Sequence, residues 1–471
     1  MLEQFIKNRI IACLSFMPNE GQNALLDKLS RFIISPVERK AFILLGYAGT
    51  GKTSMMAALV QAYKELQQKV VLLAPTGRAA KVLSRYARTP AYTIHKFIYR
   101  QKKLGEEVFS LNDNLYKNTL FIVDESSMIS GIRDNQTFGS GILLDDLVKY
   151  VYSGDGCSLL LLGDNAQLPP IGTELSPALR EEYMAKYSLN ITSHTLTEVA
   201  RQALDSGILS NATTLRHVAL NPHNSAGKDM WGYLQQSADL EMISGSDFIE
   251  KIEESYRDIG AEQTIILTRT NKRTNIYNQG IRARILWREE EIENGDRLMV
   301  SKNNYFWTEK YENLPFLANG DMLEISRLRN IREMYGFHFA DAQLRALDYD
   351  WEIDAVIWLD TLHSDSPEMN NGLHRELFGR IAEDYPELAH NRKKLIETIY
   401  QSPYYNALQV RFAYAVTGHK SQGGQWKHVY IDPYKGGELH ADEEGFYRWL
   451  YTAVTRASEK VYFIKNEQTL A

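Results

Sequence analysis

Residues 46–53 read Gly-Tyr-Ala-Gly-Thr-Gly-Lys-Thr, a complete G-x-x-x-x-G-K-T phosphate-binding pattern. The apolar run 41–45 precedes this pattern, and residues 55–66 carry apolar side chains at helical spacing. A strand, a tight loop and a helix in this order are the setting in which the motif binds phosphate. Its glycines let backbone N–H groups surround the phosphates, Lys52 adds a positive charge, and the Thr53 hydroxyl is placed to hold Mg²⁺. We therefore expect an α/β fold that binds a nucleoside triphosphate.

The length of the chain, 471 residues, predicts about three domains. Its 44% hydrophobic and 24% charged residues are typical of a globular protein. The two cysteines, Cys13 and Cys157, exclude a disulfide framework and fit a reducing cytosol. Because no stretch approaches the roughly 18 apolar residues of a membrane helix, we expect a cytoplasmic protein with no membrane partner.

The formal net charge of −6 argues mildly against a nucleic-acid partner, since small DNA-binding modules are usually basic. This charge does not exclude such a partner, because a motor needs only a local basic channel and must also release the strand. Composition alone therefore leaves the partner open.

Short apolar strands alternate with helical stretches in two parts of the chain. The expected strands are 41–45, 69–74, 119–123 and 158–162 in the first part, and 263–267, 410–416, 428–432 and 460–464 in the second. Near-continuous apolar strands with helices between them predict parallel sheets that are covered on both faces. We therefore expect two α/β domains.

Two segments interrupt these predicted sheets. Residues 98–118 are charged and lack sustained periodicity, which predicts a small hairpin that projects from the first sheet. Residues 295–405 have a different pattern, in which a helical stretch at 368–401 follows several short β-like runs. These runs occupy 297–300, 321–325 and 353–359. The pattern predicts a small β-rich domain inserted into the second sheet.

Two carboxylates, Asp124 and Glu125, follow the apolar strand 119–123. In a phosphate-loop enzyme, Asp124 would lie just outside the ligands of Mg²⁺ and Glu125 would polarise the attacking water. The alternative is a solvated pair at the end of a strand. The phosphate loop upstream favours the hydrolytic interpretation.

The stretch 163–170 reads Gly-Asp-Asn-Ala-Gln-Leu-Pro-Pro and also follows a strand. Gln167 would sense the γ-phosphate there; the alternative is a loop stiffened by two prolines with an aspartate cap. Downstream, residues 417–424 follow another strand, and residues 451–457 are compatible with a helix that ends at Arg456. An arginine supplied from a second domain stabilises the transition state of phosphoryl transfer, although most single arginines on helices are simply solvated.

The order of these motifs resembles that of the superfamily 1B helicases, the 5′→3′ DNA motors of the RecD and Dda type. The resemblance extends from Gln22 to Arg456. It rests on the phosphate loop and on the segments 74–81, 93–95, 124–128, 163–170, 196–202, 419–423 and 452–457. Chance agreement of so many separate segments in family order is negligible.

The resemblance implies two RecA-like parallel-sheet domains with a small pin hairpin insertion and an SH3-like β-barrel insertion. The implied domains are 1–195 for the first RecA-like domain, with N-terminal helices and the pin at about 98–118, then 196–294 and 406–471 for the second, and 295–405 for the inserted SH3-like and helical domain. ATP and Mg²⁺ would lie between the RecA-like domains, with single-stranded DNA across their tops. Phe109 or Leu104 would be the apolar wedge of the pin. The segment 318–321 resembles a family loop ahead of the barrel.

Individual roles are also implied by the resemblance. The implied catalytic residues are Lys52, Glu125, Gln167, Arg201 and Arg456, of which the two arginines act as fingers. The implied nucleotide-binding residues are Gln22, Gly46, Ala48, Gly49, Thr50, Gly51, Lys52, Thr53 and Ser54, and Gln22 would read the adenine edge. The implied metal-site residues are Thr53 and Asp124. The implied DNA-contacting residues are Pro75, Thr76, Arg78, Thr93, His95, Thr417, His419, Lys420 and Ser421.

Short hydroxylated and basic side chains at strand ends suit contacts with sugar and phosphate. The aromatic residues Phe97, Tyr99 and Tyr414 would stack on bases or, as the alternative, pack in the core. The insertion 130–154 has no assigned role in this interpretation, with a mobile loop near the DNA exit as one alternative, and the helical stretch 368–401 is longer than an SH3-like barrel requires. Either insertion is a candidate partner-binding segment.

We expect a monomer that acts on single-stranded DNA and on junctions with duplex DNA, with single-strand-binding, replication or repair proteins as partners. Two other functions stay open. A DNA-stimulated ATPase would translocate or remodel nucleoprotein without separating strands. A nucleotide-binding switch would act without nucleic acid, and the segment 419–423 argues against it.

Overall fold

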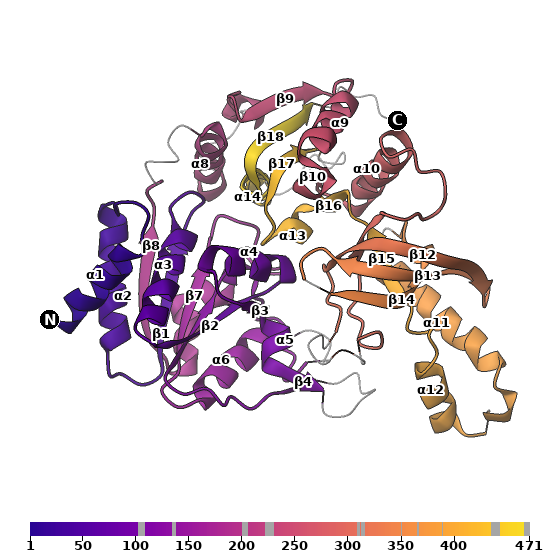
Figure 1. Cartoon of the computed structure of the whole chain (residues 1–471), viewed down its shortest axis with the longest axis horizontal. Helices are drawn as coiled ribbons and strands as arrows, with labels where there is room; N and C mark the ends of the chain where they lie inside the picture. Colours follow the sequence, from indigo (N-terminus) through magenta and orange to yellow (C-terminus); the bar gives the residue numbers. More distant parts are fainter. Residues whose placement is uncertain are drawn as a thin grey trace. The chain divides into compact units, whose positions relative to one another are not determined.

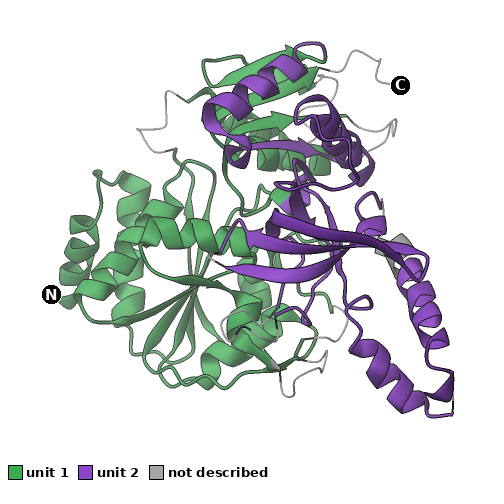
Figure 2. Cartoon of the chain, turned by 45° about the vertical axis from the view of Figure 1, so that its right-hand side comes forward, with its two compact units in different colours: residues 1–245, 421–471 green, residues 246–420 purple. Residues whose placement is uncertain are grey.

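The chain divides into two compact units (Figure 2). Unit 1 comprises residues 1–245 and 421–471, and unit 2 comprises residues 246–420. The structure is a computed structural model. It describes residues 1–101, 109–133, 138–199, 206–221, 230–308, 311, 316–349, 351–364, 367–388, 390–434 and 443–465.

A parallel sheet with the order β3-β2-β6-β7-β1-β8 forms the centre of unit 1 (Figure 1). Its strands are β1 (Lys40–Gly46), β2 (Lys69–Ala74), β3 (Ala91–Thr93), β6 (Thr119–Val123), β7 (Ser158–Gly163) and β8 (Asn190–Leu196). The strands predicted at 41–45, 69–74, 119–123 and 158–162 are all present. Because β6 and β7 are buried along their whole length, their sequences read as continuous apolar runs.

Helices cover both faces of this sheet. The helices of this part are α1 (Leu2–Ala12), α2 (Glu20–Ile34), α3 (Lys52–Glu65), α4 (Gly77–Ala87), α5 (Ile94–Ile98), α6 (Leu143–Ser153) and α7 (Glu181–Met184). On one face, Leu120 of β6 joins a core cluster with Leu29 of α2 and Leu59 of α3. On the other face, the Phe121 ring meets Tyr150 of α6 edge to face, with centroids 6.1 Å apart. This alternation along β6 confirms the predicted burial of both faces.

A short hairpin leaves the first sheet within the residues predicted to form a pin. Its described strands are β4 (Tyr99–Gln101) and β5 (Phe109–Leu111), which pair antiparallel. Leu104 lies outside the described residues. Phe109 is 2% exposed, and its ring centroid lies 5.1 Å from that of Phe138. The interpretation of Phe109 as an exposed wedge is therefore wrong, because its ring belongs to the core.

The second sheet has the order β16-β10-β17-β18-β9. Its strands are β9 (Leu240–Ser244), β10 (Thr264–Thr268), β16 (Ala415–Thr417), β17 (Trp426–Ile431) and β18 (Ala457–Lys465). The helices of this part of the chain are α8 (Gly207–Leu220), α9 (Phe248–Ile259), α10 (Asn271–Arg284), α13 (Gly418–Ser421) and α14 (Glu443–Val454). The predicted strands 263–267, 428–432 and 460–464 are present with shifted ends.

Unit 2 contains a closed barrel. Its strands are β11 (Arg297–Val300), β12 (Met322–Met334), β13 (Phe337–Ala346), β14 (Glu352–Trp358) and β15 (Leu408–Phe412). β15 pairs antiparallel with β11 and parallel with β14, and thereby closes the barrel. The single strand predicted at 410–416 is therefore wrong: Ala413 and Tyr414 connect the last barrel strand to β16 of the second sheet.

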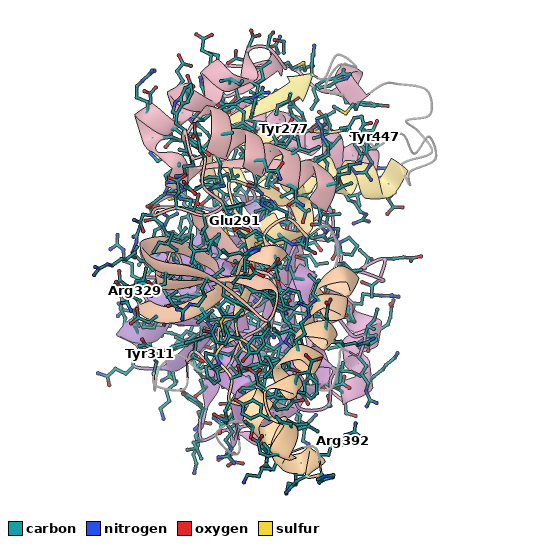
Figure 3. The ribbon with its side chains drawn as sticks, turned by 90° about the vertical axis from the view of Figure 1, so that its right-hand side faces the viewer. Tyr277, Glu291, Tyr311, Arg329, Arg392 and Tyr447 are labelled. Carbon is teal, nitrogen blue, oxygen red and sulfur yellow. The ribbon has the colours of Figure 1, made fainter. Side chains whose placement is uncertain are left out.

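Two helices, α11 (Pro367–Glu383) and α12 (Arg392–Tyr400), form an arm between β14 and β15. Leu377 and Ile399 of the arm are fully buried in a cluster with Trp358 of the barrel. Figure 3 shows Arg392 at the end of the arm. The helical stretch predicted at 368–401 is thus two helices. No helix of the described part of the chain, α11 included, has the length and apolar composition to cross a membrane.

Asp296, immediately before β11, is fully buried and anchors α10 to the barrel. Its carboxylate accepts two hydrogen bonds from Arg282, both at 3.0 Å, and one from Arg288 at 2.5 Å. A further bond comes from the Tyr414 hydroxyl at 2.9 Å. Tyr414 is 3% exposed and Tyr99 is 5% exposed, so both rings are core residues rather than platforms for bases.

Candidate active site

Three neighbouring strands of the first sheet carry the predicted hydrolytic residues. The phosphate loop follows β1, Asp124 and Glu125 follow β6, and the stretch 163–170 follows β7 between them. Parallel strands place their carboxyl ends at one edge of a sheet, so the three segments meet there. A Cβ on Gly163 would lie 3.1 Å from the Ser127 amide nitrogen, which shows how closely the segments after β6 and β7 approach each other.

The phosphate loop turns into α3 through two glycines with a left-handed backbone. Gly49 has a φ of 73° and Gly51 has a φ of 86°. A Cβ on Gly51 would lie 2.8 Å from Gln22 Nε2, so both the backbone and the close approach require glycine. The glycines therefore let the loop turn tightly into the N-terminus of α3, a backbone arrangement of the kind that binds phosphate.

Lys52, Thr53 and Ser54 form the first turn of α3. The Lys52 ammonium donates hydrogen bonds to the carbonyl oxygens of Gly46 and Tyr47, the second at 3.0 Å. Lys52 and Thr53 are half-buried, and Ser54 is exposed. The lysine charge and the threonine hydroxyl thus belong to the loop that the sequence predicts to hold phosphate.

Gln22 is buried beside the phosphate loop and caps a helix. Its Nε2 donates to the Thr50 carbonyl oxygen at 3.0 Å, and its Oε1 accepts from the Asn19 amide at 3.0 Å. Asn19 Oδ1 in turn accepts from the Gln22 amide at 2.8 Å, which completes a capping box at the start of α2. Both ends of the Gln22 side-chain amide therefore have protein partners, and its contact with adenine stays a prediction.

Glu125 adopts a left-handed backbone conformation, φ 51° and ψ 36°, that is uncommon for a residue with a Cβ. Its amide donates to Asp124 Oδ1 at 2.8 Å. Burial raises the pKa of the Asp124 carboxyl to about 6, and the charge of Glu125 adds to this effect, whereas Lys52 and Arg456 oppose it. Backbone strain of this kind persists where the surrounding structure maintains it, and it is common at active sites.

Arg456, just after α14, reaches Glu125. Its Nη1 lies 3.7 Å from Glu125 Oε1. The guanidinium also donates to the carbonyl oxygen of Thr452 at 3.0 Å and to that of Gly424 at 3.3 Å, and the residue is 5% exposed. The structure thus brings together two predicted catalytic residues that are far apart in the sequence. The other predicted finger, Arg201, lies outside the described residues.

Tyr451 joins the phosphate loop to the stretch 163–170. Its hydroxyl accepts a hydrogen bond from the Ala48 amide at 2.8 Å and donates one to Asp164 Oδ2 at 2.6 Å. Asp164 Oδ1 also accepts from the Ala166 amide at 2.9 Å. Neither Tyr451 nor Asp164 is predicted from the sequence to act at the site. The available signal was that both lie inside motif segments, one beside Arg456 and the other beside Gln167.

Three further hydrogen bonds hold the same stretch in place. Leu168 donates through its amide to Thr452 Oγ1 at 2.9 Å, and its carbonyl oxygen accepts from Gln422 Nε2 at 2.6 Å. The Arg448 guanidinium donates to the Asn165 carbonyl oxygen. The backbone of this loop is therefore hydrogen-bonded to two residues of α14, the helix that precedes Arg456, and to Gln422.

Gln167 lies in the middle of this loop and is 7% exposed. Among the residues that the structure describes, its Oε1 has no hydrogen-bond partner. Buried acceptors without donors are rare, and each marks a place where a water or a ligand is expected. This observation supports the predicted role of Gln167 beside the γ-phosphate.

Arg216 of α8 is a second residue that the sequence does not indicate. Its guanidinium carbon lies 4.1 Å from the centroid of the Tyr47 ring in the phosphate loop, and the residue is 7% exposed. A buried cation over an aromatic face stabilises that contact and adds positive potential beside the loop. No local motif marks this arginine, because the contact depends on how α8 packs.

Five of the predicted DNA-contacting residues lie at or just after the ends of β2 and β3 in unit 1. They are Pro75, Thr76, Arg78, Thr93 and His95. The two threonine hydroxyls are helix N-caps: Thr76 accepts from the Ala79 amide at 3.2 Å, and Thr93 accepts from the Lys96 amide at 3.3 Å. Each hydroxyl therefore stabilises the start of the helix that follows its strand, and its contact with DNA stays a prediction.

Arg78 also makes contacts inside unit 1. Its guanidinium carbon lies 4.1 Å from the Trp426 ring centroid, and Nη2 donates to the Gln425 carbonyl oxygen at 3.3 Å. A Cβ on Gly423 would lie 3.1 Å from Thr76 Oγ1. The segment that begins with the fully buried Ser421 therefore packs against the start of α4.

In unit 2, Thr417 ends β16, and the next two predicted contacts, His419 and Lys420, are exposed on α13. Lys420 Nζ donates to Asn319 Oδ1 at 2.5 Å. In the same loop, Asp321 Oδ2 accepts from the Ala318 amide at 2.8 Å. The loop 318–321 of the barrel and an exposed lysine that is predicted to contact DNA therefore lie together.

Family models match two parts of the chain. Residues 19–222 match the family described as an AAA domain, and residues 412–464 match the UvrD-like helicase C-terminal domain. The first match contains the phosphate loop, Glu125 and Gln167, and the second contains Arg456.

Individual proteins match over different lengths. Uncharacterized protein R530 of Acanthamoeba polyphaga mimivirus is 26% identical over 95% of this chain and 100% of that protein. The ATP-dependent DNA helicase dda of Enterobacteria phage T4 is 24% identical over 91% of this chain and 95% of that protein. The ATP-dependent RecD2 DNA helicase of Deinococcus radiodurans is 29% identical over 43% of this chain, a match that spans 25% of RecD2. A crystal structure of Pif1 helicase from Bacteroides with ADP-AlF3 and ssDNA is 13% identical, covers 97% of this chain and 94% of that chain, and has a TM-score of 0.48.

A phosphate loop at the edge of a RecA-like sheet, completed by a carboxylate pair, a buried glutamine and an arginine, defines a P-loop ATPase. The two family matches and the dda and RecD2 relatives indicate which group of P-loop ATPases the chain resembles. The chain is similar to the superfamily 1B helicases of the RecD and Dda type.

Proposed function

We propose that this enzyme moves 5′→3′ along single-stranded DNA and separates duplexes, powered by the hydrolysis of Mg-ATP. The observation that carries the proposal is the 3.7 Å contact between Arg456 and Glu125. It joins a carboxylate suited to activate water with an arginine suited to stabilise the transition state. The dda and RecD2 relatives are named ATP-dependent DNA helicases, which supports DNA as the substrate.

Hydrolysis requires a water molecule in line with the γ-phosphorus. Glu125 would accept a proton from this water as the new P–O bond forms, while the bond from the γ-phosphorus to the β–γ bridging oxygen breaks and ADP leaves. Lys52 and Arg456 would neutralise the charge that develops on the phosphate oxygens. Gln167, whose Oε1 lacks a partner within the described ranges, would accept a hydrogen bond from the attacking water.

The residues present fit a magnesium ion. Thr53 would hold it through the hydroxyl, and Asp124 would accept hydrogen bonds from its waters. The described residues include no group of three or more histidine, cysteine or carboxylate side chains suited to a metal. This agrees with Mg²⁺ at a phosphate loop, because that ion takes most of its ligands from phosphate and water. When bound, it would neutralise charge on the β- and γ-phosphates.

The stretch 163–170 would couple ATP hydrolysis to movement of the enzyme along DNA. Loss of the γ-phosphate would change the contacts of Gln167, and the same stretch is hydrogen-bonded to Gln422 and Arg448. Two RecA-like domains that alternate their grip on the strand would convert this change into directional steps. Arg201 would be the second arginine finger in this cycle.

The DNA strand would run along the strand ends that carry hydroxylated and basic residues. The proposed contacts are Pro75, Thr76, Arg78, Thr93, His95, Thr417, His419, Lys420 and Ser421. Contacts of this type recognise sugar and phosphate rather than bases. A footprint of about five phosphates would give a log–log slope of affinity against salt near −3.5. We expect a monomer that prefers single strands and their junctions with duplex.

Unwinding of partial duplexes with matched 5′ and 3′ single-stranded tails, in ATP and Mg²⁺, tests activity and polarity together. The 5′-tailed substrate should unwind, and preference for the 3′-tailed substrate would refute the polarity. Lys52→Ala and Glu125→Gln should each abolish DNA-stimulated ATP turnover in a folded protein. Unchanged turnover in both variants would refute the site.

One observation favours a second candidate function. Phe109, one of the two residues expected from the sequence to serve as a wedge, is buried where it pairs with Gln101 of the hairpin. A hairpin without another apolar wedge would suit a DNA-stimulated ATPase that translocates and remodels nucleoprotein without separating strands. Strand displacement measured beside ATP turnover distinguishes the two, because the translocase predicts stimulated turnover with no displacement.

A further inference from the structure

The segment 138–146, which has no role predicted from the sequence, packs against the β4–β5 hairpin. The Phe138 ring centroid lies 5.0 Å from that of Tyr99 and 5.1 Å from that of Phe109, which come from different strands of the hairpin. The Gly139 amide also donates to the Phe109 carbonyl oxygen at 2.8 Å. A segment outside the hairpin thus contacts both of its strands.

Asp146 of α6 fixes this arrangement. The residue is 4% exposed, and its Oδ2 accepts from the Tyr99 hydroxyl at 2.7 Å and from the Ser140 amide at 2.9 Å. Burial raises the pKa of the Tyr99 hydroxyl, and the Asp146 carboxylate raises it further, so the hydroxyl remains a donor. Gly139 has a φ of 44°, and a Cβ there would lie 2.2 Å from Asp146 Oδ2, so only glycine fits.

The same aromatic group reaches a proposed DNA contact. The Phe138 and His95 ring centroids are 5.0 Å apart in an edge-to-face arrangement, and those of His95 and Tyr99 are 5.9 Å apart. One cluster of rings therefore connects a residue proposed to touch the strand with the hairpin proposed to divide the duplex. A ring cluster that served only to pack the first sheet would not need to include both His95 and the two strands of the hairpin.

We propose that residues 138–146 are a buttress that holds the β4–β5 hairpin against the first sheet while strands separate. This inference rests on the proposed helicase function. A hairpin with three residues in each described strand is not stable by itself and would bend under the load of a duplex. The Tyr99–Asp146 hydrogen bond would resist that load at the base of the hairpin, and the Phe138 ring would resist it along both strands. These three are positioning residues and take no part in ATP hydrolysis.

Tyr99→Phe tests the buttress because it removes the hydroxyl and keeps the ring. Unwinding of a 5′-tailed duplex should slow by about fivefold or more, the effect expected from one lost buried hydrogen bond in the loaded state. ATP turnover stimulated by single-stranded DNA should stay within about twofold of wild type, because the contacts of Tyr99 involve Asp146, His95 and Phe138 and none of the hydrolytic residues. The ratio of base pairs separated to ATP hydrolysed is the decisive measurement.

Tyr187→Phe is the matched control. The Tyr187 hydroxyl donates to Asp145 Oδ1 at 2.5 Å, on the residue next to Asp146 in α6, but Tyr187 lies outside the hairpin. Both variants lose one tyrosine–aspartate hydrogen bond to the same helix. Comparable thermal unfolding midpoints of the two variants would exclude a general loss of stability as the cause of any difference. Of these two tyrosine variants, Tyr99→Phe should slow unwinding and Tyr187→Phe should not.

Two variants of Phe138 extend the test. Phe138→Ala should reproduce the unwinding defect, and Phe138→Leu should restore most of the activity because leucine refills the apolar volume. Unwinding by Tyr99→Phe at the wild-type rate would overturn the proposal, and so would equal losses of unwinding and ATP turnover. A wild-type protein that hydrolyses ATP but separates no strands would refute the helicase function and the buttress with it.

Discussion

The Tyr451 hydroxyl donates a hydrogen bond to the Asp164 carboxylate at 2.6 Å and accepts one from the Ala48 amide at 2.8 Å. One hydroxyl group therefore links the phosphate loop, the stretch 163–170 and the helix that leads to Arg456. Tyr451 is 1% exposed, so these bonds form in a low-dielectric environment where they are strong. We therefore expect a change in the phosphate loop to reach the segment that holds the arginine through these two bonds.

We predict that Tyr451→Phe lowers kcat for DNA-stimulated ATP turnover about tenfold, because a buried amide and carboxylate that lose their shared partner cost about 1–3 kcal/mol. KM for ATP should change less than about twofold, since the ring still fills its site. Steady-state kinetics measures both parameters. The control is Tyr462→Phe, a buried tyrosine whose ring stacks on Tyr430 with centroids 4.5 Å apart. A wild-type kcat in Tyr451→Phe would contradict the link.

Arg456→Lys should lower kcat by about 10³-fold or more, the contribution measured for arginine fingers. Lysine keeps the charge but lacks the planar fork that reaches Glu125 and two backbone carbonyl oxygens together. Single-turnover hydrolysis and the binding of a fluorescent nucleotide separate chemistry from affinity. Arg180→Lys, at an exposed arginine, is the control. If binding and turnover fell equally, Arg456 would serve to hold the nucleotide rather than to accelerate its hydrolysis.

The central strands of the first sheet could be predicted because burial on both faces makes them apolar throughout. By contrast, β8 is an edge strand with mostly half-buried residues, and its sequence Asn-Ile-Thr-Ser-His-Thr-Leu contains no apolar run. In β13 the buried positions include Ala340, Ala342 and Ala346, and alanine is a weak signal for a strand. The pairing of β15 with β11 and β14 depends on contacts far apart in the sequence, which no local pattern specifies.

Glu125 and Arg456 could be predicted as site residues because each lies in a local motif with fixed neighbours. Arg216 could not, since its approach to Tyr47 depends on the packing of α8. Gln22 is the opposite case: its motif predicts a contact with adenine, whereas the structure gives both ends of its side-chain amide protein partners. A motif locates a residue near a site, but the hydrogen bonds that the residue makes follow from tertiary packing.

Asp296→Asn should lower the free energy of unfolding of unit 2 by about 3 kcal/mol, because it leaves Arg282 and Arg288 with a neutral partner at a buried site. Urea unfolding followed by tryptophan fluorescence measures this change. Asp354→Asn is the control, since its side chain is 61% exposed and pairs with Arg329 at 2.8 Å. The control should change the free energy by less than about 0.5 kcal/mol. Similar losses in both variants would show that burial does not determine the strength of the Asp296 network.

His374 of the arm is half-buried against the barrel. Its Nε2 contacts the Tyr405 carbonyl oxygen at 3.2 Å, and its ring centroid lies 4.4 Å from that of Tyr405 and 6.0 Å from that of Trp358. Burial, together with the positive charge of Lys302, lowers the pKa of His374 to about 4, and the Tyr405 carbonyl opposes the shift. The ring is therefore neutral in the folded protein at neutral pH.

The unfolded chain takes up a proton at an ordinary histidine pKa of 6.5, whereas folded His374 does so only near pH 4, so the unfolded state binds more protons between these values. The free energy of unfolding should therefore fall as the pH drops from 6.5 towards 4. His374→Phe should remove this component, and the wild-type protein should lose about 1–2 kcal/mol more than the variant between pH 7 and pH 5. Urea unfolding across this range tests the prediction, with His390→Phe at the exposed end of the arm as the control. A difference between wild type and His374→Phe that stays constant with pH would mean that the folded arm protonates this ring as readily as the unfolded chain does.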